Sequence, residues 1–314
     1  MVDTATKTAP PAEQQQQEQQ PQQQQLPPHH QRGSSASGSE DPRSPAPLGL
    51  GPTTHMAYLI EQCRPCVLRP FCFFVSWQGV LTLAFTGFPP ALVTLKDDVS
   101  SFYSCLPREN PGSRWPKATL GALRDGRRLT PQELAALKDV CRGCSGIFQT
   151  PGQPKRQAVL VDRLAAVVYE CRSLERQISK AVVVMRAGRG APGGEAAAFG
   201  GGNAADIDVS EPTAEERARV DRIVSEQDEE DYWFHASKDG NRESHYRDAA
   251  LGATLVHELS CFGGSGGPAP ADGRYSGALP AILGTFRARV DAALPGAYAW
   301  FSEPSLHVTI RGLI

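Results

Sequence analysis

The sequence predicts an α+β fold built from a duplicated strand–helix–strand unit, which follows a disordered N-terminal arm. Three observations lead to this prediction. Short apolar strands alternate with amphipathic helices along residues 79–314, and the same order of elements recurs near both ends of that region. Residues 1–55 carry no recurring apolar positions, so no core can offset the entropy lost when a chain is ordered.

Low-complexity segments set the predicted domain boundaries. Ten glutamines lie between Gln14 and Gln25, and prolines and serines follow them, so residues 1–55 form the predicted arm. Glycine-rich residues 187–212 are a predicted flexible linker, and residues 263–277 are a predicted insert of the same kind. A first lobe over 79–186 and a second lobe over 213–314 remain.

The segment 56–78 has an unusual composition. No charged residue occurs in 71–88, which reaches the lower limit of length for a membrane span. Gln78, Thr82 and the break at 87–90 argue against a span, and residues 79–85 are better interpreted as a buried strand. We hypothesise that residues 63–78 are a translated intron and thus an error in the predicted gene. A chain that starts near Gly79 should then fold as well as the full chain.

The first copy of the unit starts with the strand 79–85. The apolar positions Leu92, Leu95, Val99 and Phe102 follow on one helical face, and residues 117–123 form a short strand after a loop with a tryptophan. A second helix starts after Thr130, where Glu133 completes a capping box (TPQE). The apolar spacing in 157–180 favours a helix, although the run AVVY within it could equally be a strand.

The second copy repeats this order. A charged helix starting near Thr213 leads to the strand 252–259, and Leu283, Phe286, Val290 and Ala293 then repeat the helical spacing of the first copy. A loop with Trp300 and the strand 305–314 end the chain. Three matched elements in one order indicate a duplicated unit.

The last strand carries the motif His307-Val308-Thr309. It resembles the H-x-T strand of the 2H phosphoesterase superfamily, which includes LigT-like RNA 2′,3′-cyclic phosphodiesterases. The resemblance implies two pseudo-symmetric lobes around a central cleft, each contributing one H-x-T strand. The first copy has Lys117-Ala118-Thr119 where the second histidine is expected. The sequence therefore has one of the two H-x-T motifs that are typical of the family.

The residues of these motifs suggest a division of roles. Side chains two apart in a strand share a face, so His307 lies beside Thr309 and Lys117 beside Thr119. An imidazole suits acid–base catalysis, and the resemblance implies that the threonines hold phosphate oxygens without a metal. An ordinary lysine stays charged at neutral pH and suits phosphate binding, unless burial lowers its pKa by several units.

The missing second imidazole could come from two other places. His245 has Arg242 and Arg247 beside it, and guanidinium groups bind phosphate in a bidentate manner. His257 lies in an apolar strand. The ordinary alternatives are a core position for His257 and a surface ion pair for Arg247.

Charge and cysteine content narrow the classes of partner. A formal charge of −2 and a pI near 6.4 argue against a protein that coats nucleic acid, but they allow a nucleotide or RNA-end phosphate as ligand. Eight cysteines without a secretory signal indicate reduced thiols in the cytoplasm or the nucleus. We expect no membrane association, no cofactor and no zinc, although Cys63/Cys66 and Cys141/Cys144 form C-x-x-C pairs.

The sequence supports two interpretations of function. The first is a metal-independent hydrolase for 2′,3′-cyclic phosphates or RNA 3′ ends, with His307 and Thr309 as catalytic residues and Lys117, Thr119, His245 and Arg247 as substrate-binding residues. The second is a non-catalytic phosphate-binding or scaffolding module of the same fold, in which one histidine has been lost. A third possibility is a gene truncated at its 3′ end, because the second copy has no counterpart of the helix that follows the strand of the first copy after Thr130.

Overall fold

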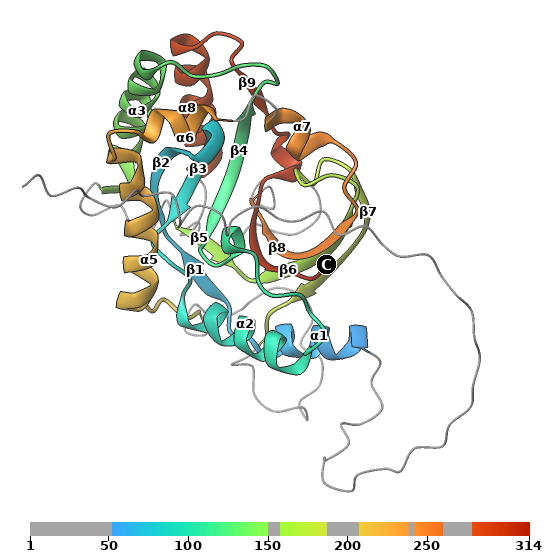
Figure 1. Ribbon diagram of the computed structural model, residues 1–314. Coiled ribbons are helices and arrows are strands. Elements are labelled where there is room, and N and C mark those ends of the chain that lie inside the picture. Colours follow the sequence, from blue (N-terminus) through green and yellow to red (C-terminus); the bar gives the residue numbers. More distant parts are fainter. Residues whose placement is uncertain (1–51, 150–157, 187–206, 239–241, 260–277) are drawn as a thin grey trace, which may run out of the picture. The chain divides into compact units, whose positions relative to one another are not determined.

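Antiparallel strands organise the fold. The computed structural model describes residues 52–149, 158–186, 207–238, 242–259 and 278–314 (Figure 1). Most of the predicted arm, the linker up to residue 206 and the insert 263–277 lie outside the described residues. The predicted α+β class is confirmed, because helices pack against sheets whose strands pair in an antiparallel manner.

Eight of the described strands form one sheet in the order β2-β3-β4-β10-β8-β6-β7, with β9 paired to β4. Two further strands, β1 and β5, form a separate antiparallel pair. The bounds of the sheet strands are Pro70–Ser76 (β2), Val80–Phe85 (β3), Lys117–Leu123 (β4), Arg163–Tyr169 (β6), Gln177–Val184 (β7), Gly252–Glu258 (β8), Tyr298–Trp300 (β9) and His307–Gly312 (β10), and those of the pair are Cys66–Leu68 (β1) and Val159–Val161 (β5).

The four strands predicted for the two copies are confirmed, and they are neighbours in the sheet. β3 pairs with β4, β4 with β10, and β10 with β8, all antiparallel. The two strands that carry the KAT and HVT sequences therefore lie side by side at the centre of the sheet.

The helices predicted after Pro90, Thr130 and Thr213 and around Leu283 are present. Thr130 accepts a hydrogen bond from the Glu133 amide and donates its own amide to the Glu133 carboxylate, which confirms the capping box. The helix after Thr213 is shorter than predicted and ends at Ser225. The helices are Pro52–Gln62 (α1), Pro90–Phe102 (α2), Pro131–Ser145 (α3), Ala214–Ser225 (α5), Tyr232–Ser237 (α6), Arg242–Arg247 (α7) and Leu279–Ala293 (α8), and the 3-10 turns include Trp77–Gly79 (η3) and Glu303–Ser305 (η9).

The two faces of the sheet differ in how they are covered. Leu83, Ala118 and Val308 point from three adjacent strands into the main core, which helices α2, α3 and α8 cover. In Figure 1, α3 and α8 lie together at one end of the molecule. The opposite face carries two smaller apolar clusters, one around Ala84 that includes Val220 of α5, and one around Val256. The motif strands lie between these two clusters.

Residues 63–78, which we interpret as a translated intron, contain β1 and the sheet strand β2. β2 pairs with β3 over its length, and its Phe73, Phe74 and Val75 are buried. The segment is thus an edge strand of the sheet whose alternate side chains fill both faces, which explains its long apolar run. A chain starting at Gly79 would lack this strand, so the structure gives a reason to expect that it folds less well than the full chain.

Side chains occupy the outward-facing backbone groups of β2. Its Phe73 amide donates a hydrogen bond to Ser145 Oγ over 2.8 Å, and its Val75 carbonyl accepts one from the Tyr232 hydroxyl over 2.9 Å. Covering an edge in this way hinders pairing with a further strand. None of the described helices has the length and apolar character needed to cross a bilayer.

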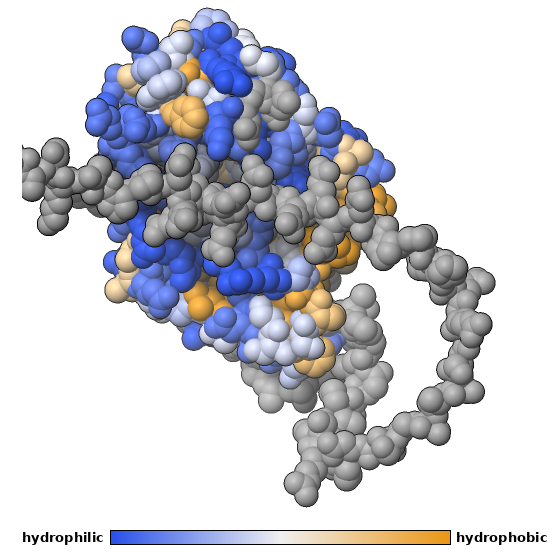
Figure 2. All heavy atoms as spheres, in the orientation of Figure 1, coloured by the Kyte–Doolittle hydropathy of each residue, from blue (hydrophilic) through white to orange (hydrophobic). Residues whose placement is uncertain are grey.

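Residues 157–180 do not form the helix favoured by their spacing; the alternative prediction of a strand is the correct one. Leu164 of β6 is buried in the main core, whereas Ala165 and Val167 lie in the cluster on the opposite face. Burial on both faces produced apolar positions that imitate helical spacing. β6 pairs with β8, so this part of the predicted first lobe lies beside a strand of the second. The next strand, β7, is exposed, and Figure 2 shows hydrophobic surface in its region.

Candidate functional site

The pair Ala118 and Val308 fixes the geometry of the candidate site. They are cross-strand partners at the centre of the sheet, and both are fully buried. The flanking residues Lys117, Thr119, His307 and Thr309 consequently point to the other face, where all four are half-buried. Diagonal neighbours on such a pair of strands are about 7–8 Å apart, so Lys117 and His307 can reach one small ligand.

The loop over residues 109–115 lies on one side of Lys117 and is fixed by contacts with α2. The buried Lys96 ammonium of α2 donates to the Ser113 carbonyl and forms an ion pair with Glu109, each over 2.8 Å. These contacts fix the segment that leads to Trp115, whose ring centroid lies 4.7 Å from the Lys117 ammonium. A cation over an aromatic face is attracted by the ring quadrupole.

Lys117 is a half-buried cation on the site face. Among the described residues, no ion pair within 4.0 Å involves it. Burial, and to a smaller extent the positive charge of Arg242, lower the pKa of Lys117 to about 8. Lys117 is therefore mostly charged at neutral pH and yet acidic enough to give up a proton.

Helix α7 lies on a second side of the candidate site. The Tyr246 hydroxyl and the Thr119 hydroxyl are hydrogen-bonded, and the Arg242 guanidinium lies 6.0 Å from the centroid of the Tyr246 ring. The Tyr246 ring also packs against that of Phe301, with centroids 5.1 Å apart. α7 thus brings a tyrosine and an arginine to the two residues of the KAT strand that share the site face.

His307 is held in one tautomer. Its Nδ1 lies 2.7 Å from the Ser305 carbonyl oxygen, and a carbonyl can only accept, so Nδ1 carries the proton. The neutral ring then keeps a lone pair on Nε2. Burial lowers the pKa of His307, which the Ser305 hydrogen bond and the Glu258 carboxylate only partly oppose. The imidazole is hence neutral at pH 7 and suited to accept a proton.

His257 does not supply the second imidazole. It is the cross-strand partner of Val308, so its side chain points to the face opposite His307. It is almost fully buried, and its Nδ1 lies 3.1 Å from the Arg163 carbonyl oxygen. Strand alternation therefore gives His257 the core position that we considered as its ordinary alternative.

His245 and Arg247 make contacts on the outer side of α7. Arg247 forms ion pairs with Glu175 over 2.9 Å and with Glu243 over 2.6 Å, and it donates to the Trp300 carbonyl. His245 Nε2 lies 3.0 Å from an Arg172 guanidinium nitrogen. These contacts give Arg247 the ion pairs that we considered as its ordinary alternative, and they bring His245 to Arg172.

Sequence reasoning missed Trp115, Tyr246 and Ser305. Trp115 could have been found, because it lies two residues before Lys117 and so continues the same strand alternation. No pattern in the sequence marks Tyr246, since its contact with Thr119 joins positions 127 residues apart.

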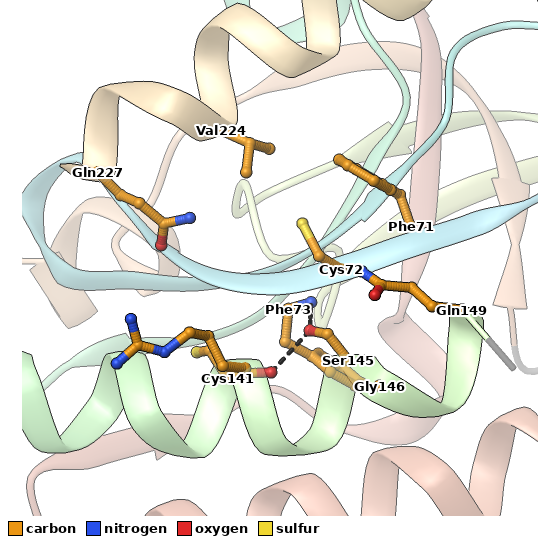
Figure 3. A pocket seen from close by; sticks show the side chains of 10 residues that line it. Phe71, Cys72, Phe73, Cys141, Ser145, Gly146, Gln149, Val224 and Gln227 are labelled. Atoms are coloured by element: carbon orange, nitrogen blue, oxygen red, sulfur yellow. Dashed lines mark hydrogen bonds between the residues drawn. The ribbon is translucent and has the colours of Figure 1, made fainter.

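A separate pocket lies along β2, away from the motif residues. It has a volume of about 370 Å³ and is bounded by α3, by β2 and by the end of α5 (Figure 3). Cys72 and Cys141 both line it.

Burial raises the pKa of the Cys72 thiol to about 12, and that of the Cys63 thiol likewise to about 12. Such thiols stay protonated at neutral pH.

The described residues contain no group of three or more histidine, cysteine, aspartate or glutamate side chains placed to hold a metal ion. Comparison of the chain with protein-family models, with curated proteins and with solved structures gives no match. The sheet register and the contacts of the four motif residues are accordingly the basis for function.

Proposed function

We propose that the protein is a phosphodiesterase-like hydrolase that acts on 2′,3′-cyclic phosphates or RNA 3′ ends at the face formed by Lys117, Thr119, His307 and Thr309. The register of Ala118 against Val308 carries this proposal, because it places all four side chains on one face of neighbouring strands. An acid–base group, a cation and two hydroxyls are then neighbours on this face, and these are groups that hydrolysis of a phosphate ester requires.

The order of the central strands supports descent from a duplicated unit. β3, α2 and β4 repeat as β8, α8 and β10, and the sheet order β3-β4-β10-β8 reads the same outward from its centre. We interpret these elements as two pseudo-symmetric lobes that meet at the Ala118–Val308 pair. The resemblance of the HVT sequence to the 2H phosphoesterases likewise implies two pseudo-symmetric lobes, each with one H-x-T strand.

The proposed reaction divides proton transfer between two residues. His307 Nε2 takes a proton from water, the water oxygen forms a bond to phosphorus, and one P–O bond of the cyclic phosphate breaks. The departing ribose oxygen takes a proton from the Lys117 ammonium, which then regains one from solvent. Thr119 and Thr309 donate hydrogen bonds to the other phosphate oxygens. Lys117 has this second role because its pKa is lowered to about 8.

Turnover assays test the proposal directly. Purified protein is incubated with the 2′,3′-cyclic nucleotides and with short RNAs that end in a cyclic phosphate, with and without a chelator, and products are separated by chromatography. We expect chelator-resistant formation of a monophosphate, which is lost in His307→Ala. His55→Ala is the matched control, since His55 lies on α1 and stacks on Phe102. Turnover that persists in His307→Ala would refute the assignment.

A second function is a phosphate-binding module without turnover. The observation that favours it is the lysine at position 117, since His257 points away and leaves His307 without a second imidazole from its neighbouring strand. The same assay separates the two functions. Binding of the cyclic nucleotide without product would support the module.

A further inference from the structure

We infer that the outer edge of β7 pairs with β7 of a second copy of the chain, in an antiparallel manner and with Ala181 at the centre of the pairing. β7 (Gln177–Val184) lies at one end of the sheet, and among the described strands it pairs with β6 alone (Figure 1). The inference does not depend on the proposed hydrolase activity, because β7 carries none of the four motif residues. It assigns an interaction surface, and the occupant of that surface is a second copy.

One hydrogen bond shows which backbone groups of β7 point outward. The Met185 amide donates to the carbonyl of Asp162, which directly precedes β6, over 2.9 Å. The direction of backbone hydrogen bonding alternates along a strand, and the register stays constant from here back to the pair of Ser179 and Val168. Every second residue in this stretch therefore directs its amide and carbonyl away from β6. These residues are Lys180, Val182 and Val184.

The lysine of β7 does not shield this edge. Natural sheets often protect an edge strand with a lysine side chain, which opposes pairing with another strand. Lys180 instead forms an ion pair with Glu258 over 3.1 Å, and Glu258 lies on β8, two strands further into the sheet. The lysine side chain thus lies across the face of the sheet. Val182 and Val184 remain 49% and 43% exposed at the edge, where Figure 2 shows hydrophobic surface.

The charge of β7 favours a second copy as the occupant. Lys180 is the only charged residue of the strand, and Glu258 balances it. A nucleic acid or an acidic segment would have to compete with Glu258 for this lysine, and β7 itself offers no carboxylate to a basic segment. A neutral strand rich in valine is stabilised most by a partner strand of the same kind, and β7 of another molecule is such a strand.

The end of α1 limits the length of the pairing. The Arg186 amide donates to the Glu61 carbonyl over 3.0 Å, so the C-terminal end of α1 lies directly beyond β7. By the same alternation this amide points outward, and α1 therefore occupies the outer side at that position. A second copy can pair over residues 178–184, whose centre is Ala181. In a two-fold antiparallel pair the central residue lies opposite its own symmetry mate.

This register brings compatible side chains together. Lys180 of one copy lies opposite Val182 of the other, and each such pair exchanges two backbone hydrogen bonds. A centre one residue nearer the N-terminus would place the two Lys180 side chains opposite each other, which is unfavourable. Ala181 and its symmetry mate form a non-hydrogen-bonded pair, in which the two Cα atoms are about 4.5 Å apart.

Sedimentation velocity of the full chain tests the association. We expect a monomer–dimer equilibrium at micromolar to submillimolar concentrations. Val182→Lys places a second lysine opposite Lys180 at two symmetry-related positions, so it should weaken dimerisation about tenfold. Val209→Lys is the matched control and should dimerise like the parent, because Val209 is also an exposed valine and lies outside the strands. A parent that stays monomeric over this range, or Val182→Lys that dimerises equally well, would overturn the inference and leave the edge to a strand of another protein.

Disulfide trapping tests the register. Cys105, which is exposed, and Cys261, which lies outside the described residues, are first replaced by serine in every chain. Ala181→Cys should then give a disulfide-linked dimer on mild oxidation, because Cα atoms about 4.5 Å apart fit a disulfide. Val182→Cys is the matched control: it exposes a thiol one residue away that lies opposite Lys180, so it should link much more slowly. Equal or faster linkage of Val182→Cys would overturn the pairing centred on Ala181.

Discussion

Ala118 of β4 and Val308 of β10 are direct cross-strand partners, and each is completely shielded from solvent. Strand side chains alternate between the two faces of the sheet. The burial of this pair in the main core therefore means that Lys117 and His307 lie on the opposite face. A register shift of one residue would turn both into the main core, where an unpaired ammonium is strongly disfavoured. The chemistry of the motif and the stability of the sheet therefore depend on the same register.

His307 is expected to control the acid limb of the pH profile. Burial lowers the pKa of His307. Above that lowered pKa the imidazole is neutral and can accept a proton. The activity should therefore fall as the pH drops through the pKa. His307→Ala should reduce kcat by about 10²–10⁴-fold, which is typical of a general base, and leave the Kd for adenosine 3′-monophosphate largely unchanged. Steady-state kinetics and calorimetry measure the two. A large loss of binding with unchanged kcat would contradict the role.

Three substitutions at Lys117 separate charge from proton donation. Lys117→Ala should weaken phosphate binding and turnover together. Lys117→Arg should keep binding but lower kcat, because a guanidinium stays protonated and donates poorly. In the parent, activity should fall as pH rises through about 8, where the ammonium loses its proton. Lys117→His should move that limb to lower pH, and it should raise turnover if the position lacks only an imidazole.

Lys117 should also destabilise the fold. At pH 7 it is charged in both the folded and the unfolded chain, and burial disfavours that charge only in the folded one. Lys117→Met should raise the free energy of unfolding by about 1–3 kcal/mol at pH 7, measured by urea denaturation. Between its folded pKa of about 8 and its ordinary value of 10.5, the folded state loses the proton first, so the parent becomes relatively more stable with rising pH. The gain from methionine should shrink across this window. A gain independent of pH would contradict the assignment.

Arg247 should contribute to stability and not to phosphate affinity. Arg247→Ala leaves the half-buried carboxylate of Glu175 without its main partner, although that carboxylate still accepts a hydrogen bond from the Ser302 amide. Loss of one member of such a pair costs on the order of 1–3 kcal/mol, so the melting temperature should fall by several degrees. Glu175→Gln with Arg247→Ala should recover part of the loss. An unchanged melting temperature with weaker nucleotide binding would restore Arg247 as a phosphate clamp.

Truncations test the place of β2 in the fold. A chain starting at Gly49 keeps the whole compact unit and should melt at the temperature of the full chain. A chain starting at Gly79 lacks β2 and should lose its cooperative transition in circular dichroism, because β3 loses its partner and the core loses several aromatic side chains. Phe73→Ala in the full chain should cost about 3–5 kcal/mol as a milder test.

The sequence was informative wherever one periodicity dominated. The helices at Leu92 and Leu283 and the cap at Thr130 follow from spacing and end residues alone, and the central strands follow from their turns. It misled where both faces of a strand are buried, as in β2 and β6, because periodicity then no longer separates strand from helix. The motif face could be predicted by alternation. The contributions of Tyr246 and Arg242, and the distinction between Arg242 and Arg247, depend on how α7 packs, which no local pattern encodes.

The two ends of the sheet have different capacities for self-association. At β2, Ser145 and Tyr232 already satisfy outward-facing backbone groups. At the other end, β7 pairs only with β6 among the described strands and exposes Ile178, Val182 and Val184 (Figure 2). Of the two ends of this sheet, as far as the described residues define them, β7 is therefore the one at which the edge of a second copy can pair, and pairing there joins two copies.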